Sequence, residues 1–413
     1  MTFSVVEGGS EKAKPKPEPS DLNTESMNLT AENLSLPYET FLRAATSLKD
    51  KVVEETWNRR DQVVDPTVYS GLLGTAFTCL RSYQVTGCRN DLLLCRDIVD
   101  TCVTAARASL SNRHVTFLCG SGGVYALGAV VANYMEDLRK RDLFLALFIE
   151  VAKEKALPVG PEEGGFGMSY DLMYGRAGFL WGALFLNKHL GEEAVPKDIL
   201  VPIIDAVLAG GRAGASDIKE CPLMYRWHGT RYLGAANGLA GILHVLLHFP
   251  LPSEDAEDVK GTLRYLMSKR FPHSGNYPSS EGNPRDKLVQ WSHGATGMAI
   301  TFCKAAQVFP NDRELRDAAI EAGEVVWKSG LVKKMGLADG VSGNAYAFLS
   351  LYRLTKESIY EERAKSFASC LYDNAKSLAP ANGYSLFQGL AGTACLLFDL
   401  LQPQNSRFPG YEL

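Results

Sequence analysis

The chain has 413 residues, of which 46% are hydrophobic and 22% are charged, and its formal net charge is −4. These proportions are those of a soluble globular protein, and they exclude a chain that is disordered throughout or that spans a membrane as a helical bundle. No long basic run is present to neutralise a phosphate backbone, so we expect no nucleic-acid partner.

Three further features predict a cytoplasmic protein. The N-terminus lacks the basic start and apolar stretch of a secretory signal. The nine cysteines are scattered singly, which favours reduced and mostly buried thiols over a disulfide framework. No apolar run reaches the roughly 18 residues of a spanning helix, so we expect no transmembrane segment, and any contact with the plasma membrane would be peripheral.

Residues 1–36 are predicted to form a disordered N-terminal tail. They are rich in Lys, Glu, Pro, Ser and Asn and show no hydrophobic periodicity, so they cannot bury enough apolar surface to offset the entropy of ordering. Residues 37–413 are predicted to form a single domain, because one motif recurs along them.

The recurring motif is Gly-x-x-Gly followed by small or apolar residues. Successive copies lie 46 to 63 residues apart, which leaves room for two helices and two loops in each interval. The seven copies begin at Gly71, Gly120, Gly175, Gly238, Gly294, Gly340 and Gly389.

Two classes of helix alternate between these motifs. Segments that follow a motif, such as GILHVLLHF, are apolar nearly all round and are typical of helices buried on every side. The segments between them are amphipathic; one is predicted to begin behind Asn311 as N-cap, with Glu314 three positions on. Seven helices of each class predict an all-α fold, an α/α toroid in which seven outer helices surround seven inner ones. The buried stripes of two amphipathic segments are Leu315, Ala318, Ala319, Ala322, Val325 and Val326, and Tyr360, Ala364, Phe367, Ala368 and Leu371.

The repeated glycines have a structural and a functional explanation. They allow a tight turn into an inner helix and a close approach of neighbouring helices, which suffices for any single copy. Together, however, they would gather seven helix N-termini on one rim, where anionic groups are favoured. We therefore expect any ligand site to lie at this mouth of the toroid.

Four long stretches resemble the LanC-like (lanthionine synthetase C-like) proteins, most closely their plant branch. The resemblance extends over nearly everything after residue 60 and implies the same double ring of helices. It also implies a site at the toroid mouth, where the family binds zinc through one Cys of a W-C-H-G motif and the Cys and His of a C-H-G motif. There the metal activates a thiol that adds to a dehydroamino acid, which gives lanthionine rings or glutathione adducts. The stretches are CPLMYRWHGTRYLGAANGLAGI from Cys221, QWSHGATG from Gln290, GLADGVSGNAYAFLSLYRLT from Gly336 and YSLFQGLAGTA from Tyr384.

This chain departs from the family pattern at every zinc ligand. Ser292 stands at the first Cys position, and Ala338 and Asp339 stand at the Cys-His pair. A catalytic zinc site needs three protein ligands, whereas Ala338 has no donor atom and Ser292 only a neutral hydroxyl, so we expect no bound zinc and no other cofactor. Asn237 occupies the position of a family histidine and cannot transfer protons, and Gln388 replaces a glutamate. We assign no catalytic residue.

Four other residues match family positions near the cavity. His228 and Arg231 lie in the stretch that borders it, and Lys333 and Lys334 match a basic position that helps to hold glutathione or phosphate. Structural packing is the simpler explanation for the first pair and ordinary surface exposure for the second. All four are nevertheless candidate ligand contacts.

Two alternative sites are less well supported by the sequence. Asp339, Ser292 and His293 offer an O,O,N set for a harder cation, but they would need ligands from elsewhere, and His293 is more simply a hydrogen-bonded rim residue. Cys119 precedes a glycine turn, where a helix N-terminus lowers a thiol pKa, yet no histidine accompanies it and burial explains it better.

The sequence therefore predicts a LanC-like protein that keeps the toroid but has lost zinc-dependent thioether chemistry. We expect it to act as a binding or regulatory protein for a small molecule or protein at the mouth, in plant hormone signalling by resemblance only. The alternative is an active transferase that adds glutathione or another thiol to dehydroamino acids. Carbohydrate processing would need a carboxylate pair at the mouth, and Asp339 is the only candidate.

Overall fold

The described part of the chain is helical. The computed structural model describes residues 38–60, 65–108, 114–157, 168–373 and 383–413, so the tail predicted at 1–36 lies outside the described residues. In the described ranges there are fourteen α-helices and no strand, and two isolated bridges, Trp227–Thr230 and Tyr232–Ser280, are the whole β content. Short helical turns also occur at Glu54–Asn58, Ala152–Ala156 and Pro403–Asn405.

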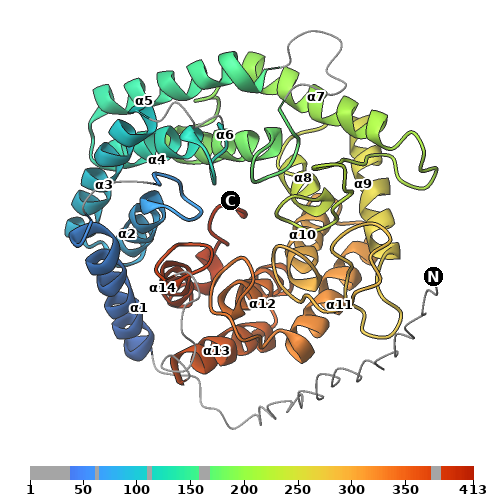
Figure 1. Cartoon of the computed structure of the whole chain (residues 1–413). Coiled ribbons are helices and arrows are strands. Elements are labelled where there is room, and N and C mark those ends of the chain that lie inside the picture. Colours follow the sequence, from blue (N-terminus) through green and yellow to red (C-terminus); the bar gives the residue numbers. More distant parts are fainter. Residues whose placement is uncertain (1–37, 61–64, 109–113, 158–167, 374–382) are drawn as a thin grey trace, which may run out of the picture. The chain divides into compact units, whose positions relative to one another are not determined.

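Seven of these helices form an inner ring (Figure 1). Each has the first glycine of a Gly-x-x-Gly motif as its N-cap, as the repeat predicts. They are buried on nearly all sides, as their uniformly apolar sequences require. The inner helices are α2 (Leu72–Thr86), α4 (Ser121–Tyr134), α6 (Arg176–Leu190), α8 (Leu239–Leu246), α10 (Ala295–Val308), α12 (Val341–Thr355) and α14 (Leu390–Asp399).

The other seven helices form an outer ring. The predicted buried stripes of the last two of them are confirmed, and the only difference is the N-cap of α11, which is Asp312 and not Asn311. The outer helices are α1 (Tyr38–Val53), α3 (Arg89–Ala108), α5 (Leu138–Val151), α7 (Lys197–Gly214), α9 (Ser253–Ser268), α11 (Arg313–Ser329) and α13 (Ser358–Asp373).

The two ends of the described fold complete the double ring. From α2 to α13, each inner helix packs against the outer helix that follows it in sequence. The last inner helix, α14, has no outer helix after it and instead packs against α1, while its other contacts include α2. The seventh helix pair therefore combines the first and last α-helices, and the predicted α/α toroid is confirmed.

Glycine is required at the motif positions mainly because a Cβ atom there would clash with main-chain atoms of the preceding turn. Gly340 has an ordinary extended conformation with φ −129°, so left-handed backbone does not explain its use. A Cβ on the second glycine of the same motif, Gly343, would lie 1.9 Å from the main-chain oxygen of Leu337. In another copy, a Cβ on Gly178 would lie 2.0 Å from the oxygen of Leu172. The chain thus folds back directly over each helix start, which supports the structural explanation of the repeat.

The C-terminal segment, residues 400–413, enters the ring (Figure 1). Phe408 and Tyr411 are fully buried, and the indole N–H of Trp181 donates to the main-chain oxygen of Tyr411 (2.7 Å). The hydroxyl of Tyr411 also forms a hydrogen bond with that of Thr301 (2.6 Å). Because these contacts come from α6 and α10, the segment ties together inner helices that are far apart in sequence.

Candidate functional site

The mouth of the ring is defined by the turns that precede the inner helices. The residue directly before each cap glycine is polar in all seven copies, although the sequences around it differ. The seven positions hold Ser70, Cys119, Tyr174, Asn237, His293, Asp339 and Gln388.

Main-chain hydrogen bonds join several neighbouring turns. The N–H of Ser292 donates to the oxygen of Ala338 (3.0 Å), and the N–H of Ala338 donates to that of Phe387 (2.8 Å). The series continues from Phe387 to Tyr69 (3.2 Å) and from Tyr69 to Leu118 (2.9 Å). These five residues occupy equivalent places, two before the cap glycine, so the bonds fix the spacing of the turns and bring positions 292 and 338 together.

The zinc-ligand positions implied by the resemblance hold groups that are already engaged. The hydroxyl of Ser292 donates to the oxygen of Ala338 (2.8 Å), whose own side chain is a buried methyl group. The carboxylate of Asp339 pairs with the ammonium of Lys334 (2.5 Å). Among the described residues, no three His, Cys, Asp or Glu side chains come together in a group that could hold a metal ion. This donor set does not fit zinc, and the Lys334 pair also opposes a harder cation at Asp339.

Asn237 positions a neighbouring turn. Its side-chain amide donates to a carboxylate oxygen of Asp171 (3.1 Å), which also accepts from the main-chain N–H groups of Met173 (3.0 Å) and Tyr174 (2.9 Å). Burial raises the pKa of Asp171, while these hydrogen bonds act in the opposite direction. Sequence reasoning missed Asp171, although an Asp shortly before a glycine-capped helix is a common signal for a side chain that closes a turn.

His293 is not the hydrogen-bonded residue that its sequence position suggests. Its Nδ1 atom is buried and has no hydrogen-bond partner among the described residues. Burial also lowers the pKa of His293, so its imidazole is neutral at physiological pH. Its ring lies 5.8 Å from that of Tyr232, at an angle of 31°. The histidine thus has an aromatic contact with Tyr232 and a buried ring nitrogen without a hydrogen bond.

The loop before α8 extends toward the mouth through an aromatic contact. His228 is exposed at a tight turn, with φ 46°, which is closed by two hydrogen bonds between Trp227 and Thr230. The indole of Trp227 stacks on Tyr174, which directly precedes the α6 cap (6.0 Å between centroids, 8° between planes). Arg231 is bound instead to Asp217 in an ion pair.

The four candidate ligand contacts therefore divide into two pairs. His228 and Lys333 are exposed and available, whereas Arg231 and Lys334 are engaged in ion pairs with carboxylates of the protein.

Cys119 lacks the environment of a nucleophile. Burial, and secondarily the charge of Asp171, raise the pKa of its thiol to about 12, so the thiolate is scarce at neutral pH. None of the nine cysteines forms a disulfide, and six of them are buried, as predicted.

The double ring with its glycine-capped mouth defines an α/α toroid. Similarity to known proteins identifies its family. The family model for lanthionine synthetase C-like protein matches residues 62–413, and the chain belongs to this family. It is 66% identical over 398 residues to LanC-like protein GCL1 of Arabidopsis thaliana, a match that covers 93% of this chain and 92% of the relative. It is 35% identical over 383 residues to a protein of Danio rerio named Glutathione S-transferase LANCL1, covering 89% and 92%.

A solved structure and the helix lengths add two findings. Nisin cyclase superposes with a TM-score of 0.63 at 14% identity, covering 87% of this chain and 94% of that chain, which supports the fold alone. None of the helices in the described part of the chain combines the length and the apolar character needed to cross a membrane.

Proposed function

We propose that this LanC-like protein binds a small molecule or a protein segment at the toroid mouth and does not carry out zinc-dependent thioether chemistry. The observation that carries the proposal is the engagement of the three ligand positions: Ser292 donates to Ala338, Ala338 offers only a methyl group, and Asp339 pairs with Lys334. A regulatory protein of the cytoplasm, with peripheral membrane contact at most, fits this proposal. A role in hormone signalling rests on the plant resemblance alone.

The mouth retains features suited to binding. The stacked rings of Trp227 and Tyr174 and the neutral imidazole of His293 supply aromatic surface, and Asn237 supplies a neutral amide. Aromatic walls with a few polar groups are typical of sites that bind without catalysis as well as of enzymes. The proposed ligand would therefore be recognised by stacking and hydrogen bonding.

The purified protein should hold almost no zinc. The protein purified without chelators should contain less than about 0.1 zinc ion per chain, because one carboxylate cannot supply the roughly 10–16 kcal/mol of a full zinc site. Elemental analysis after gel filtration measures this directly. Stoichiometric zinc that survives dialysis would contradict the proposal.

A second candidate function is thiol transfer, favoured by the zebrafish relative whose name is glutathione S-transferase. In this reaction the thiol sulfur forms a bond to the β-carbon of a dehydroamino acid, the C=C bond becomes single, and the thiol proton goes to the α-carbon. Lys333 is exposed and could hold a carboxylate of glutathione. The protein would also need a base to deprotonate the thiol, and Asn237 cannot act as one.

The assay that separates the two functions uses glutathione and a dehydroalanine peptide with added zinc. We expect the adduct to form no faster with the protein than without it, since no metal or base that could activate the thiolate is in place. Mass spectrometry detects the adduct, and an Asn237→Ala variant serves as a control for reaction at the mouth. Formation well above the uncatalysed rate, reduced in that variant, would establish the transferase instead.

A further inference from the structure

A cavity lies at the end of the ring opposite the mouth. It measures about 510 Å³, a size that suits a small metabolite, and its wall includes the last turns of α2, α4 and α6 and part of the C-terminal segment. Lys188, near the end of α6, lies about 20 Å along the helix from its cap glycine, at about 1.5 Å per residue. The cavity is therefore separate from the mouth.

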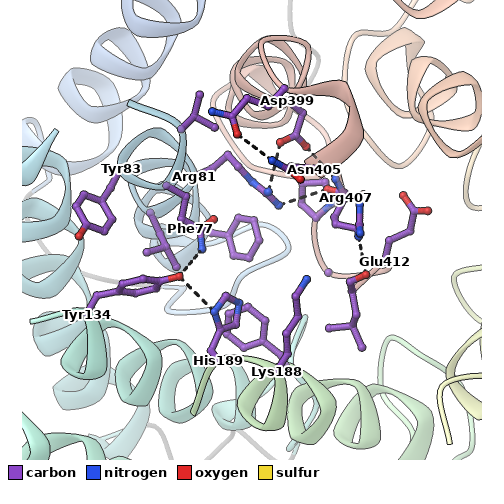
Figure 2. A pocket seen from close by; sticks show the side chains of 18 of the residues that line it. Phe77, Arg81, Tyr83, Tyr134, Lys188, His189, Asp399, Asn405, Arg407 and Glu412 are labelled. Atoms are coloured by element: carbon purple, nitrogen blue, oxygen red, sulfur yellow. Dashed lines mark hydrogen bonds and ion pairs between the residues drawn. The ribbon is translucent and has the colours of Figure 1, made fainter. Parts of the chain in front are cut away.

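Charged side chains converge on this cavity from different elements. Arg81 comes from α2, Lys188 from α6, and Arg407 and Glu412 from the C-terminal segment, with Asp399 at the end of α14. Lys188 extends from its helix toward the wall that carries the two arginines (Figure 2).

Arginines satisfy the two acids of the cavity. Asp399 pairs with Arg81 (3.3 Å) and also accepts from the hydroxyl of Tyr346 (2.7 Å). Glu412 pairs with Arg353 of α12 and accepts from the hydroxyl of Ser350 (2.8 Å). Each carboxylate is thus paired with an arginine, although the charge of Glu412 also acts on Lys188.

One cation of the cavity, Lys188, forms no ion pair among the described residues. Arg407 donates through Nε to an oxygen of Leu413 (2.6 Å), the last residue of the chain, and through Nη1 to the main-chain oxygens of Ser406 (2.6 Å) and Gln404 (3.3 Å), which leaves its Nη2 without a hydrogen bond among the described residues. Lys304, in an adjoining cavity of about 200 Å³ that also includes Arg407, likewise lacks an acidic partner. The far end of the ring therefore holds two lysines, Lys188 and Lys304, that form no ion pair among the described residues.

The pKa of Lys188 agrees with the lack of an ion-pair partner. Burial, followed by the charges of Arg407 and Arg81, lowers the pKa of Lys188 to about 8. Lys188 is exposed as a residue, but the surrounding protein and the neighbouring cations still disfavour its charge. Helix C-termini attract cations, which explains why basic residues collect here, and a bound anion would relieve the repulsion that remains.

We propose that this cavity binds the phosphate group of a small phosphomonoester, held by Lys188 and Arg407. Arginine and lysine are the side chains that bind phosphate oxygens most strongly. Aromatic side chains on another wall, Phe77, Tyr83 and Tyr134, offer apolar surface to the organic part of such a ligand. Burial lowers the pKa of the neighbouring His189 to about 4, so this imidazole is neutral and forms a polar rather than charged part of the wall.

The test measures binding of phenyl phosphate and of inorganic phosphate by calorimetry at constant ionic strength. The wild-type protein should bind one phenyl phosphate per chain, more tightly than inorganic phosphate, and should not bind phenol. Lys188→Gln should weaken binding about ten-fold, because one charge-assisted contact is lost. The matched variant Lys328→Gln, which removes an exposed lysine from the outer helix α11, should change affinity less than about two-fold.

Three results would overturn the proposal: no saturable binding to the wild type, equal affinity in Lys188→Gln, or equal weakening in Lys328→Gln. Lys188→Gln should not unfold the protein, since Lys188 has no ion-pair partner to lose, and circular dichroism verifies this. Vesicles that contain phosphatidylinositol 4-phosphate distinguish the source of the phosphate. Co-sedimentation that depends on Lys188 would assign a lipid headgroup in place of a soluble ligand.

Discussion

The triple variant Ser292→Cys, Ala338→Cys, Asp339→His should bind close to one zinc ion per chain. The main-chain hydrogen bond from Ser292 to Ala338 (3.0 Å) shows that these two positions are neighbours across adjacent turns, and Asp339 follows directly in sequence. Two thiolates and an imidazole are the donors that zinc prefers, and water can complete a tetrahedral site. The expected gain is about 10 kcal/mol of apparent binding free energy at neutral pH.

Elemental analysis after dialysis against a weak chelator measures the zinc, and cobalt substitution reports the thiolate ligands by their absorption. The double variant Ser292→Cys, Ala338→Cys is the matched control, because it has both thiols but lacks the third ligand and should bind far more weakly. A triple variant that folds with the wild-type helical content yet remains free of zinc would show that the site is placed wrongly. The triple variant tests the location of the three zinc-ligand positions, whether or not the natural protein has a function at the mouth.

The fold could be predicted from the sequence because its evidence is repeated. Each of the seven motifs marks the start of an inner helix, so an error in one copy would leave six others to define the ring. The amphipathic stripes, such as the one that includes Leu315 and Val326, identify the outer helices for the same reason. The misplaced cap of α11, Asp312 in place of Asn311, is a difference of one residue at a helix end, where the local preferences of Asn and Asp are nearly equal.

The mouth was predictable in position but only partly in its contacts. The motifs place Asn237, Ser292 and Asp339 on one rim, but no sequence pattern shows that Asn237 donates to Asp171 or that Asp339 pairs with Lys334. These contacts depend on how the turns pack together. The lack of a hydrogen bond at Nδ1 of His293 was missed because the sequence alone does not show which atoms of a side chain are buried or what surrounds them.

The far cavity had no sequence signal at all. Arg81 and Arg407 are separated by most of the chain, and they meet because α14 closes the ring against α2 and the C-terminal segment turns inward. Single basic residues near helix ends are common and have no motif around them. A site made of such residues can be recognised only in the folded ring, whereas seven copies of one sequence motif predict the mouth.

The replacement of Gly343 by alanine should severely destabilise the protein. A Cβ at this position would lie 1.9 Å from the main-chain oxygen of Leu337, and neither atom belongs to a flexible side chain that could move aside. The turn before α12 would have to open, which would also disturb its neighbour Ala338 and the bonds between turns. We expect a loss of at least about 4 kcal/mol in the free energy of unfolding, in the range that marks a backbone clash in a core.

Gly87→Ala is the matched control for this change. Gly87 follows α2 with φ 71°, but nothing lies within 4 Å of the added Cβ, so the cost is only that of a left-handed conformation, about 1–2 kcal/mol. Urea unfolding followed by circular dichroism compares the two variants, with soluble expression as a second measure. Equal losses in the two would mean that the repeated glycines serve backbone conformation after all. A much larger loss for Gly343→Ala would establish that the motif recurs because the chain passes too close to each helix start for any side chain to fit.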